Sequence, residues 1–318
     1  MTMSYRPLGP SGLMVSRVGI GCNAFGARID SERTTEIVTA AIDEGVTLFD
    51  TADVYGGEPG RSEELLGAAL GSRRGDVIVA TKFGGDMHGT NGPDWDVRGS
   101  RRYIRRAVDA SLRRLGTDWI DLYQLHTPDP LTPIEETLAA LSELVAEGKV
   151  RYIGSSNFAG WQVVDADWTA HAEGYPAFVS AQNKYSLYDR SADLDLIPAC
   201  EHVGVDLLPY FPLEFGLLTG KYSRGHPAPE GTRLSIQTRR LEEADFDRVE
   251  SLQGYADERD VGLLDVAVGG LPAQPFVGSV IAGVTSVGQV RANVTAGCWE
   301  PSDDDLTILN ELTSGFTS

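Results

Sequence analysis

Four side chains with acid–base chemistry follow short apolar runs of this 318-residue sequence: Asp50, Tyr55, Lys82 and His126. A phenol has a reference pKa of about 10, but a nearby ammonium favours the phenolate and lowers that pKa. Asp50 would hold Lys82 in place and balance its buried charge. His126 could hydrogen-bond to the same oxygen that Tyr55 protonates. The set predicts proton transfer to or from the oxygen of a carbonyl or an alcohol, with Tyr55 as the general acid/base.

Each of these residues also has a purely structural explanation when it is taken alone. Asp50 and Lys82 could form only a buried ion pair, and a histidine at the end of a strand often serves packing rather than catalysis. Four titratable groups expected at one rim nevertheless form a coherent chemical set, which favours a catalytic site.

The predicted proton donor needs a hydride source, because no amino-acid side chain supplies a hydride. A nicotinamide cofactor would provide it. Ser156, Asn157 and Gln182 carry hydroxyl and amide groups that could hold a carboxamide, and Tyr210 offers a flat ring for stacking. The stretches PLEFGLLTGKY and GVTSVGQ could bind phosphates through backbone N–H groups and a helix dipole.

A repeated alternation of strands and helices must position these side chains. Eight short apolar runs recur, most of them about 26 to 44 residues apart, and helical patterns such as Ile37, Val38 and Ala41 lie between them. Runs that are apolar on both faces indicate a parallel sheet, and eight such strands close a barrel. The runs are RVGIG, VTLFD, VIVATK, WIDLYQLH, VRYIGSS, FVSAQN, VDLLPY and VGSVIAG.

The sequence therefore predicts an α/β fold, a (β/α)8 TIM barrel whose active site lies at the C-terminal ends of the strands. The competing fold is a doubly wound open sheet, which usually carries a G-x-G-x-x-G turn after its first strand. The turn here reads GIGCNAFGARID and lacks that spacing. We also expect an N-terminal β-hairpin in YRPLGPSGLMVS, a long loop over residues 214–245 and a C-terminal helix, all within one domain, 1–318.

Two helices have unusual composition. Glycine and proline are costly inside a helix, so the helix before the eighth strand should end early, at GGLP over residues 269–272. Six arginines lie between Arg101 and Arg114. They could bind an anion, but in an acidic protein we expect them on the solvated outer face of an amphipathic helix.

Composition limits the classes of partner and location. Forty-six acidic and 27 basic side chains leave a net charge of −19, which repels nucleic acid and anionic membrane surfaces, so we expect neither as a partner. The apolar runs are far shorter than the roughly 20 residues of a membrane span, and no secretory leader is evident. Cys22, Cys200 and Cys298 have neither disulfide nor metal-site spacing, so we expect no metal and a cytoplasmic location. The oligomeric state stays open.

Seven longer stretches follow one another in a characteristic order: FDTADVYGGEPGRSEELLG, VIVATKFG, SLRRLGTDWIDLYQLH, GKVRYIGSSNF, SAQNKYSLYDR, LLPYFPLEFGLLTGKY and SVIAGVTSVGQVRANV. Through them the chain resembles the aldo-keto reductase superfamily along nearly its whole length. The resemblance implies a (β/α)8 barrel that binds NADP(H) in an extended form, with Tyr55, Asp50, Lys82 and His126 as a catalytic tetrad. The chain looks most like the bacterial branch that includes sugar dehydrogenases, pyridoxal dehydrogenase and deoxysugar ketoreductases.

The same resemblance implies cofactor contacts along the barrel rim. The pyrophosphate loop would fall on residues 211–217 and the adenosine phosphate segment on residues 283–293. The full expected set is Gly21, Cys22, Asn23, Asp50, Ser156, Asn157, Gln182, Tyr210, Phe211, Pro212, Leu213, Gly216, Leu217, Lys221, Gly283, Thr285, Ser286, Gln289 and Asn293.

Several positions depart from the pattern of the superfamily. Gly283 and Gln289 stand where many members place Lys and Arg against the adenosine 2′-phosphate. We expect NADP(H) to be preferred and NAD(H) to be possible. Phe211 replaces a common serine, and Glu214 and Phe215 replace small residues, which would reshape the cover over the cofactor.

The expected substrate is a small carbonyl compound or alcohol, in contact with Tyr55, His126, Phe25 and Phe158. A sugar, an aryl aldehyde or a quinone-like ketone would each suit this lining. Three alternatives are open: an NAD-dependent sugar or alcohol dehydrogenase on the same site, a lyase that forms a Schiff base through Lys82, and a non-catalytic module that senses a cofactor and binds a partner.

Overall fold

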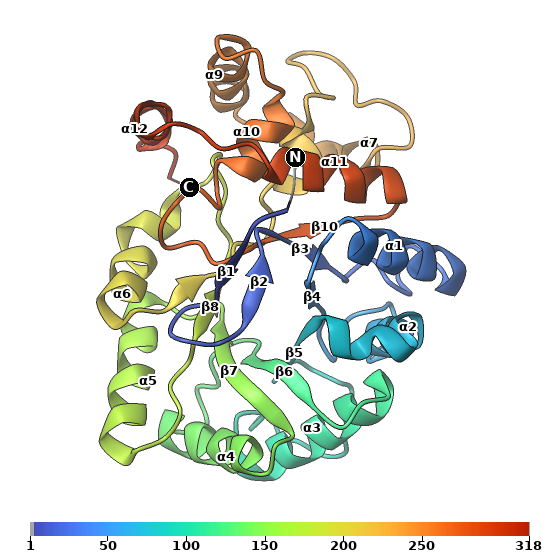
Figure 1. The fold of residues 1–318 in the computed structure, drawn as a ribbon, viewed down its shortest axis with the longest axis vertical. Helices are drawn as coiled ribbons and strands as arrows, with labels where there is room; N and C mark the ends of the chain where they lie inside the picture. Colours follow the sequence, from blue (N-terminus) through green and yellow to red (C-terminus); the bar gives the residue numbers. More distant parts are fainter. Residues whose placement is uncertain (1–2, 318) are drawn as a thin grey trace.

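Eight parallel strands follow one another around the molecule, and helices lie outside them (Figure 1). The computed structural model describes residues 3–317; residues 1, 2 and 318 of the predicted domain lie outside the described part. The strand order is β10-β3-β4-β5-β6-β7-β8-β9, and parallel bridges from Leu207 to Val277 and from Tyr210 to Ile281 join its two edges. The predicted barrel is confirmed, and the open doubly wound sheet is excluded. The strands are β3 (Val18–Gly21), β4 (Leu48–Asp50), β5 (Ile78–Phe83), β6 (Ile120–Leu125), β7 (Val150–Ser156), β8 (Ser180–Gln182), β9 (Asp206–Leu207) and β10 (Val280–Gly283).

The helices cover the outside of the barrel with their apolar faces. In α1 the buried residues Ile37, Val38 and Ala41 recur at helical spacing, and Gly45 follows the helix with a φ of +86°, which only glycine adopts freely. The helices are α1 (Ser31–Asp43), α2 (Arg61–Leu70), α3 (Arg101–Leu115), α4 (Ile134–Ala146), α5 (Gly160–Glu173), α6 (Leu196–Val203), α7 (Arg233–Ile236), α8 (Thr238–Glu242), α9 (Phe246–Asp257), α10 (Leu263–Gly269), α11 (Val287–Gly297) and α12 (Asp303–Thr313).

The predicted hairpin closes the N-terminal end of the barrel. Its strands, β1 (Tyr5–Pro7) and β2 (Met14–Ser16), pair antiparallel. Leu8, Leu13 and Val15 pack against a cluster of residues from the barrel strands and their neighbouring loops. The hairpin faces the viewer in Figure 1, so the C-terminal ends of the strands open on the far side. The cluster comprises Leu48, Ala80, Leu122, Val179, Leu208 and Ile281.

A polar layer lies two residues beyond this apolar layer on several strands. Because side chains on a strand alternate between its two faces, the residue two positions after an inward apolar residue also points inward. Asp50 follows Leu48 in this way, and Lys82 follows Ala80. The barrel interior is thus sealed at one end and polar at the other.

Two other predictions have clear outcomes. Helix α10 ends at Gly269 as expected; a Cβ on Gly269 would lie 2.5 Å from the carbonyl oxygen of Ala296. The seventh strand is shorter than expected, because β9 ends at Leu207 rather than Tyr210. Pro209 has no N–H group to donate, and beyond it only isolated bridges continue the pairing.

The arginine-rich helix α3 places Arg101, Arg102, Arg106 and Arg113 on an exposed outer face, as expected, but Arg114 lies largely inside the protein. Arg101 and Arg105 pair with glutamates at the surface of α4. Arg114 is 12% exposed, and its Nε lies 2.6 Å from Glu63 Oε2 of α2, which is fully buried. Helix α3 therefore contributes a buried ion pair to the shell of the barrel.

Candidate active site

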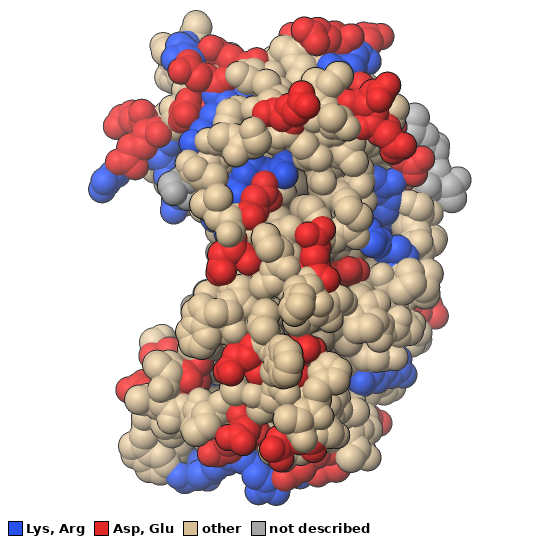
Figure 2. Space-filling view, turned by 90° about the vertical axis from the view of Figure 1, so that its left-hand side faces the viewer, with Lys and Arg blue, Asp and Glu red and all other residues tan. Residues whose placement is uncertain are grey.

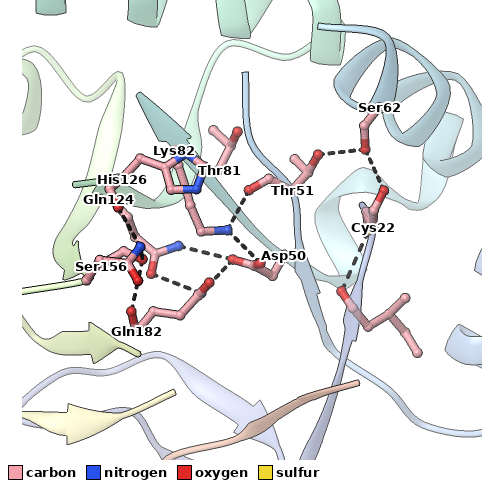
Figure 3. Close-up of polar contacts among 12 residues, drawn as sticks. Cys22, Asp50, Thr51, Ser62, Thr81, Lys82, Gln124, His126, Ser156 and Gln182 are labelled. Atoms are coloured by element: carbon pink, nitrogen blue, oxygen red, sulfur yellow. Dashed lines mark hydrogen bonds and ion pairs between the residues drawn. The ribbon is translucent and has the colours of Figure 1, made fainter. Parts of the chain in front are cut away.

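A buried ion pair occupies the centre of the polar layer (Figure 3). Lys82 Nζ lies 2.7 Å from Asp50 Oδ2 and donates a second hydrogen bond, of 2.9 Å, to the carbonyl oxygen of Thr51. Lys82 is fully buried. Burial is the strongest single influence and would lower the pKa of this ammonium, but the charge and hydrogen bond of Asp50 act together with Tyr55 and Cys22 to leave the pKa raised. Lys82 is therefore a fixed positive charge at the bottom of the site.

The second oxygen of Asp50 is held by two amides. Gln182 Nε2 donates to Asp50 Oδ1 at 2.8 Å, and Gln124 Nε2 donates to the same oxygen at 3.1 Å. Gln182 was expected to contact a cofactor carboxamide, and here it also fixes the carboxylate. Gln124 was missed by the sequence analysis, although its position two residues after Leu122 indicates that it points inward.

Tyr55 lies above the ion pair on the loop that follows β4. Lys82 Nζ is 5.1 Å from the centre of the Tyr55 ring, and the His126 ring meets that ring edge-on at 5.7 Å. The expected lowering of the Tyr55 pKa is not what the structure gives: burial raises the pKa of Tyr55, and Lys82 only opposes this rise. Tyr55 is thus a protonated phenol at neutral pH.

His126 follows β6 and stays neutral. Burial, reinforced by the Lys82 ammonium, lowers the pKa of His126 from 6.5 to about 3. Its Nδ1 atom is buried without a hydrogen-bond partner in the described part of the chain. A neutral imidazole beside Tyr55 can hydrogen-bond to a reacting oxygen without competing as a charged acid.

We expect the neutrality of His126 to make the protein less stable in acid. An unfolded histidine takes up a proton near pH 6.5, so between that pH and about 3 the unfolded state binds more protons, and acidification removes stability. When the pH falls from 7 to 5, the unfolding free energy of the unchanged protein should therefore drop by about 2 kcal/mol more than that of the His126→Gln variant, which has no imidazole to protonate. Urea unfolding at both pH values measures this difference, and equal losses in the two proteins would contradict it.

Hydroxyl and amide groups line the rim beside this centre. Asn157 has a φ of +59°, and its Nδ2 donates to the carbonyl oxygen of His126 at 2.9 Å. Tyr210 Oη donates to Asn157 Oδ1 at 2.7 Å, and Ser156 Oγ donates to the carbonyl oxygen of Gln182 at 2.9 Å. These contacts bring Ser156, Asn157, Gln182 and Tyr210 together, as the sequence analysis expected.

The ends of β3 and β10 form a small open cradle. Gly283 is exposed, and a Cβ there would lie 3.5 Å from Asn23 Oδ1, which is buried without a partner in residues 3–317. Beyond it, Ser286 caps α11, and Thr285 N donates to Gln289 Oε1 at 2.7 Å. An unpartnered amide oxygen, two neighbouring glycines and a helix N-terminus would fit the sugar and phosphate groups of a dinucleotide. Gly21 is the second glycine.

The predicted pyrophosphate loop has an unusual backbone. Phe211, Glu214 and Phe215 have φ values of +58°, +43° and +59°. The rings of Phe211 and Phe215 lie 4.4 Å apart, and Phe211 also meets Tyr210. The loop thus continues the rim beyond Tyr210, and its role in binding the pyrophosphate stays a prediction.

Three arginines beside this loop were not identified from the sequence. The guanidinium of Arg233 lies 4.7 Å, and that of Arg240 3.9 Å, from the centre of the Phe215 ring. The pKa of Arg233 is lowered, mainly by burial and then by the positive charges of Arg28 and Arg240. None of the three arginines pairs with a carboxylate among the described residues. Arg28 comes from the loop after β3, and Arg233 and Arg240 come from the short helices α7 and α8 in the long segment after β9, so only the fold brings them together.

Some predicted site residues are buried away from the rim. Phe25 is fully buried in the main core and Phe158 is 3% exposed against Phe178, so the structure gives their expected substrate contact no support. The Cys22 side chain is also buried in the core, where it is near enough to Asp50 and Lys82 to interact with their charges. Pro212, Leu217 and Asn293 are buried, Leu213 and Gly216 are half-buried, and Lys221 is exposed.

The surface around the barrel is acidic but unevenly charged. Figure 2 shows acidic and basic side chains interspersed, and a deep hollow on the left edge of the view. That edge is the side away from the hairpin, where the C-terminal ends of the strands open.

None of the helices within residues 3–317 has the length and apolar character needed to cross a membrane.

The comparison with known proteins agrees with this fold. Residues 17–314 match the model of the aldo/keto reductase family, and the chain belongs to that family. It is 35% identical to "Uncharacterized oxidoreductase YrpG" of Bacillus subtilis (strain 168), over 98% of this chain and 97% of that protein. It is 36% identical to "Versiconal hemiacetal acetate reductase" of Aspergillus parasiticus, over 84% of each chain. It is also 34% identical to "Probable voltage-gated potassium channel subunit beta" of Arabidopsis thaliana, over 92% and 91%. The chain is thus an oxidoreductase of a family that generally uses NAD(P)H.

Proposed function

We propose that this protein reduces aldehydes or ketones to alcohols, or runs the reverse reaction, with NADP(H) and with Tyr55 as general acid/base. The observation that carries the proposal is the cluster at the open end of the barrel, where Tyr55 lies between the buried Lys82 ammonium and the neutral His126 ring. The family match and the relatives named as an oxidoreductase and a reductase support the same class of reaction.

Each side chain has a defined task in reduction. Tyr55 donates its phenolic proton to the substrate oxygen, and Lys82 stabilises the phenolate that remains. Asp50 holds Lys82 at 2.7 Å, and the neutral His126 orients the oxygen by a hydrogen bond. When bound, the nicotinamide cofactor supplies the hydride, or accepts it in oxidation. Ser156, Asn157 and Gln182 would hold its carboxamide and Tyr210 its ring.

Local positive charge supports the binding of the cofactor pyrophosphate, which NADP(H) and NAD(H) share, whereas the proposed preference for NADP(H) comes from the family resemblance. Gly283 and Gln289 offer no cation at the expected 2′-phosphate position, and the net charge of −19 repels anions. The unpaired Arg28, Arg233 and Arg240 supply local positive charge beside the pyrophosphate loop. Thr285, Ser286 and the N-terminus of α11 add neutral donors.

The first test is calorimetric titration of the protein with NADPH and with NADH. We expect NADPH to bind more tightly, and Arg233→Ala to weaken its binding about ten-fold, because a charge-assisted phosphate contact is lost. Arg224→Ala is the matched control: Arg224 lies on the same loop but is already paired with Glu250 at 2.9 Å. Tighter binding of NADH would favour an NAD-dependent dehydrogenase, and binding of neither would contradict the proposal.

The Schiff-base alternative has little support from the geometry. A lysine nucleophile must lose its proton, whereas Lys82 donates to both Asp50 and Thr51 and its pKa is raised. Borohydride trapping of a carbonyl compound on Lys82 would revive this alternative.

The second candidate function is that of a non-catalytic module that senses a cofactor and binds a partner. The similarity to the Arabidopsis thaliana protein named as a channel subunit favours it. Negligible turnover combined with tight cofactor binding and a stable protein partner would favour that function over catalysis.

A further inference from the structure

The loop proposed to cover the cofactor phosphates holds three non-glycine residues in a conformation that L-amino acids avoid. Phe211, Glu214 and Phe215 all have positive φ values, between +43° and +59°. Left-handed backbone is strained for residues with a Cβ, and it persists only where the surrounding structure enforces it. Contacts with the surrounding structure must therefore hold this loop in its strained conformation.

The Glu214 side chain points from the loop back into the protein and anchors the loop there. Glu214 is 6% exposed, although it stands in the middle of a surface loop. Its Oε1 lies 3.3 Å from Lys184 Nζ and accepts a hydrogen bond of 3.2 Å from Ser186 Oγ. Lys184 Nζ also lies 2.8 Å from Asp189 Oδ2. One ammonium thus joins the loop after β9 to the loop after β8.

The backbones of these two loops are also joined beside the ion pair. Tyr210 N donates to the carbonyl oxygen of Asn183 at 3.1 Å, and Lys184 and Tyr210 form a parallel bridge. The segment 183–190 is therefore a fixed support next to the barrel wall, and Glu214 ties the strained loop to it.

This arrangement separates the charges within the loop. The acidic side chain points inward and pairs with Lys184, while Phe211 and Phe215 stack beside Arg233 and Arg240. An outward carboxylate in the same loop would repel phosphate groups. The inward contact thus keeps negative charge away from the expected phosphate path.

We propose that Lys184 and Glu214 are a positioning pair that holds the loop 211–217 in its phosphate-binding conformation before the cofactor arrives. This inference rests on the proposed use of a nicotinamide dinucleotide. Without the pair the loop relaxes, and the cofactor must restore the strained backbone when it binds, so affinity falls.

The test compares four variants by NADPH titration and by hydrogen exchange of the amides of residues 211–217 in the cofactor-free protein. Lys184→Met and Glu214→Ala each remove the pair and keep a Cβ at position 214, so we expect about ten-fold weaker binding and faster exchange. Glu214→Gly removes the pair but adopts a φ of +43° without strain, so it should regain most of the affinity lost in Glu214→Ala. Lys149→Met is the control: Lys149 also contacts two carboxylates, Asp109 and Glu147, but it precedes β7 at the other end of the barrel.

The rescue by glycine ties the lost affinity to the backbone of residue 214, because glycine adopts a φ of +43° without strain but does not restore the contact with Lys184. Faster exchange confined to the amides of residues 211–217 separates this local effect from a general loss of stability. Wild-type affinity in Lys184→Met and Glu214→Ala would overturn the inference and leave the proposed function intact. So would equal weakening in Glu214→Ala and Glu214→Gly. Failure of the unchanged protein to bind NADPH or NADH would instead overturn the proposed function, and this inference with it.

Discussion

Replacing Tyr55 by phenylalanine should lower the turnover number about 10²- to 10⁴-fold and leave cofactor affinity nearly unchanged. The substitution keeps the ring, which contacts His126 at 5.7 Å and Lys82 at 5.1 Å, and removes only the hydroxyl group. In the proposed mechanism that hydroxyl carries the transferred proton, because Lys82 is a fixed ammonium and His126 is neutral. Steady-state kinetics with a reducible aldehyde, together with NADPH titration, measure the two effects separately.

Tyr152→Phe is the matched control for this experiment. Tyr152 lies on β7, and its hydroxyl accepts a hydrogen bond of 3.2 Å from Gly12 N in the turn of the hairpin, at the closed end of the barrel. We expect its turnover to match that of the unchanged protein. A Tyr55→Phe protein that keeps turnover within ten-fold, or that loses cofactor binding to the same degree as turnover, would contradict the role assigned to Tyr55.

The sequence predicts the site residues well where the periodicity of a strand alone determines whether a side chain points into the barrel. The alternation that buries Leu48 and Ala80 also turns Asp50 and Lys82 into the barrel, so their pairing followed from position. The same alternation points Gln124 inward, so its contact with Asp50 was also predictable from its position two residues after Leu122. The fold and the centre of the site could thus be predicted from local pattern.

Contacts between distant segments could not be predicted in the same way. Arg28, Arg233 and Arg240 meet only because two loops from different strands lie over the same rim. From the sequence, Arg114 looks like one more surface arginine, because its buried partner Glu63 comes from a different helix, α2. The Tyr55 pKa shift was expected in the wrong direction, because a sequence names the charged neighbour but does not give the extent of burial.

Removing one partner of the buried pair should have the largest effect on stability. Lys82→Met leaves the Asp50 carboxylate buried with only the amides of Gln124 and Gln182 as donors, and an uncompensated buried charge costs about 3–5 kcal/mol of unfolding free energy. Urea unfolding at pH 7 measures this loss from the midpoint and the slope. Activity should also be lost, because no ammonium would then stabilise the Tyr55 phenolate.

Two further variants separate charge from packing in this experiment. Asp50→Asn combined with Lys82→Met removes both charges, so the double variant should be more stable than Lys82→Met alone while remaining inactive. Lys149→Met breaks an ion pair of 2.9 Å with Asp109 in which both side chains are partly exposed, and its unfolding free energy should change by less than about 1 kcal/mol. If Lys82→Met cost no more than that surface control, the ion pair would not be a stabilising element of the barrel. If the double variant were instead less stable than Lys82→Met, the loss would come from the packing of the lysine chain rather than from the unpaired carboxylate.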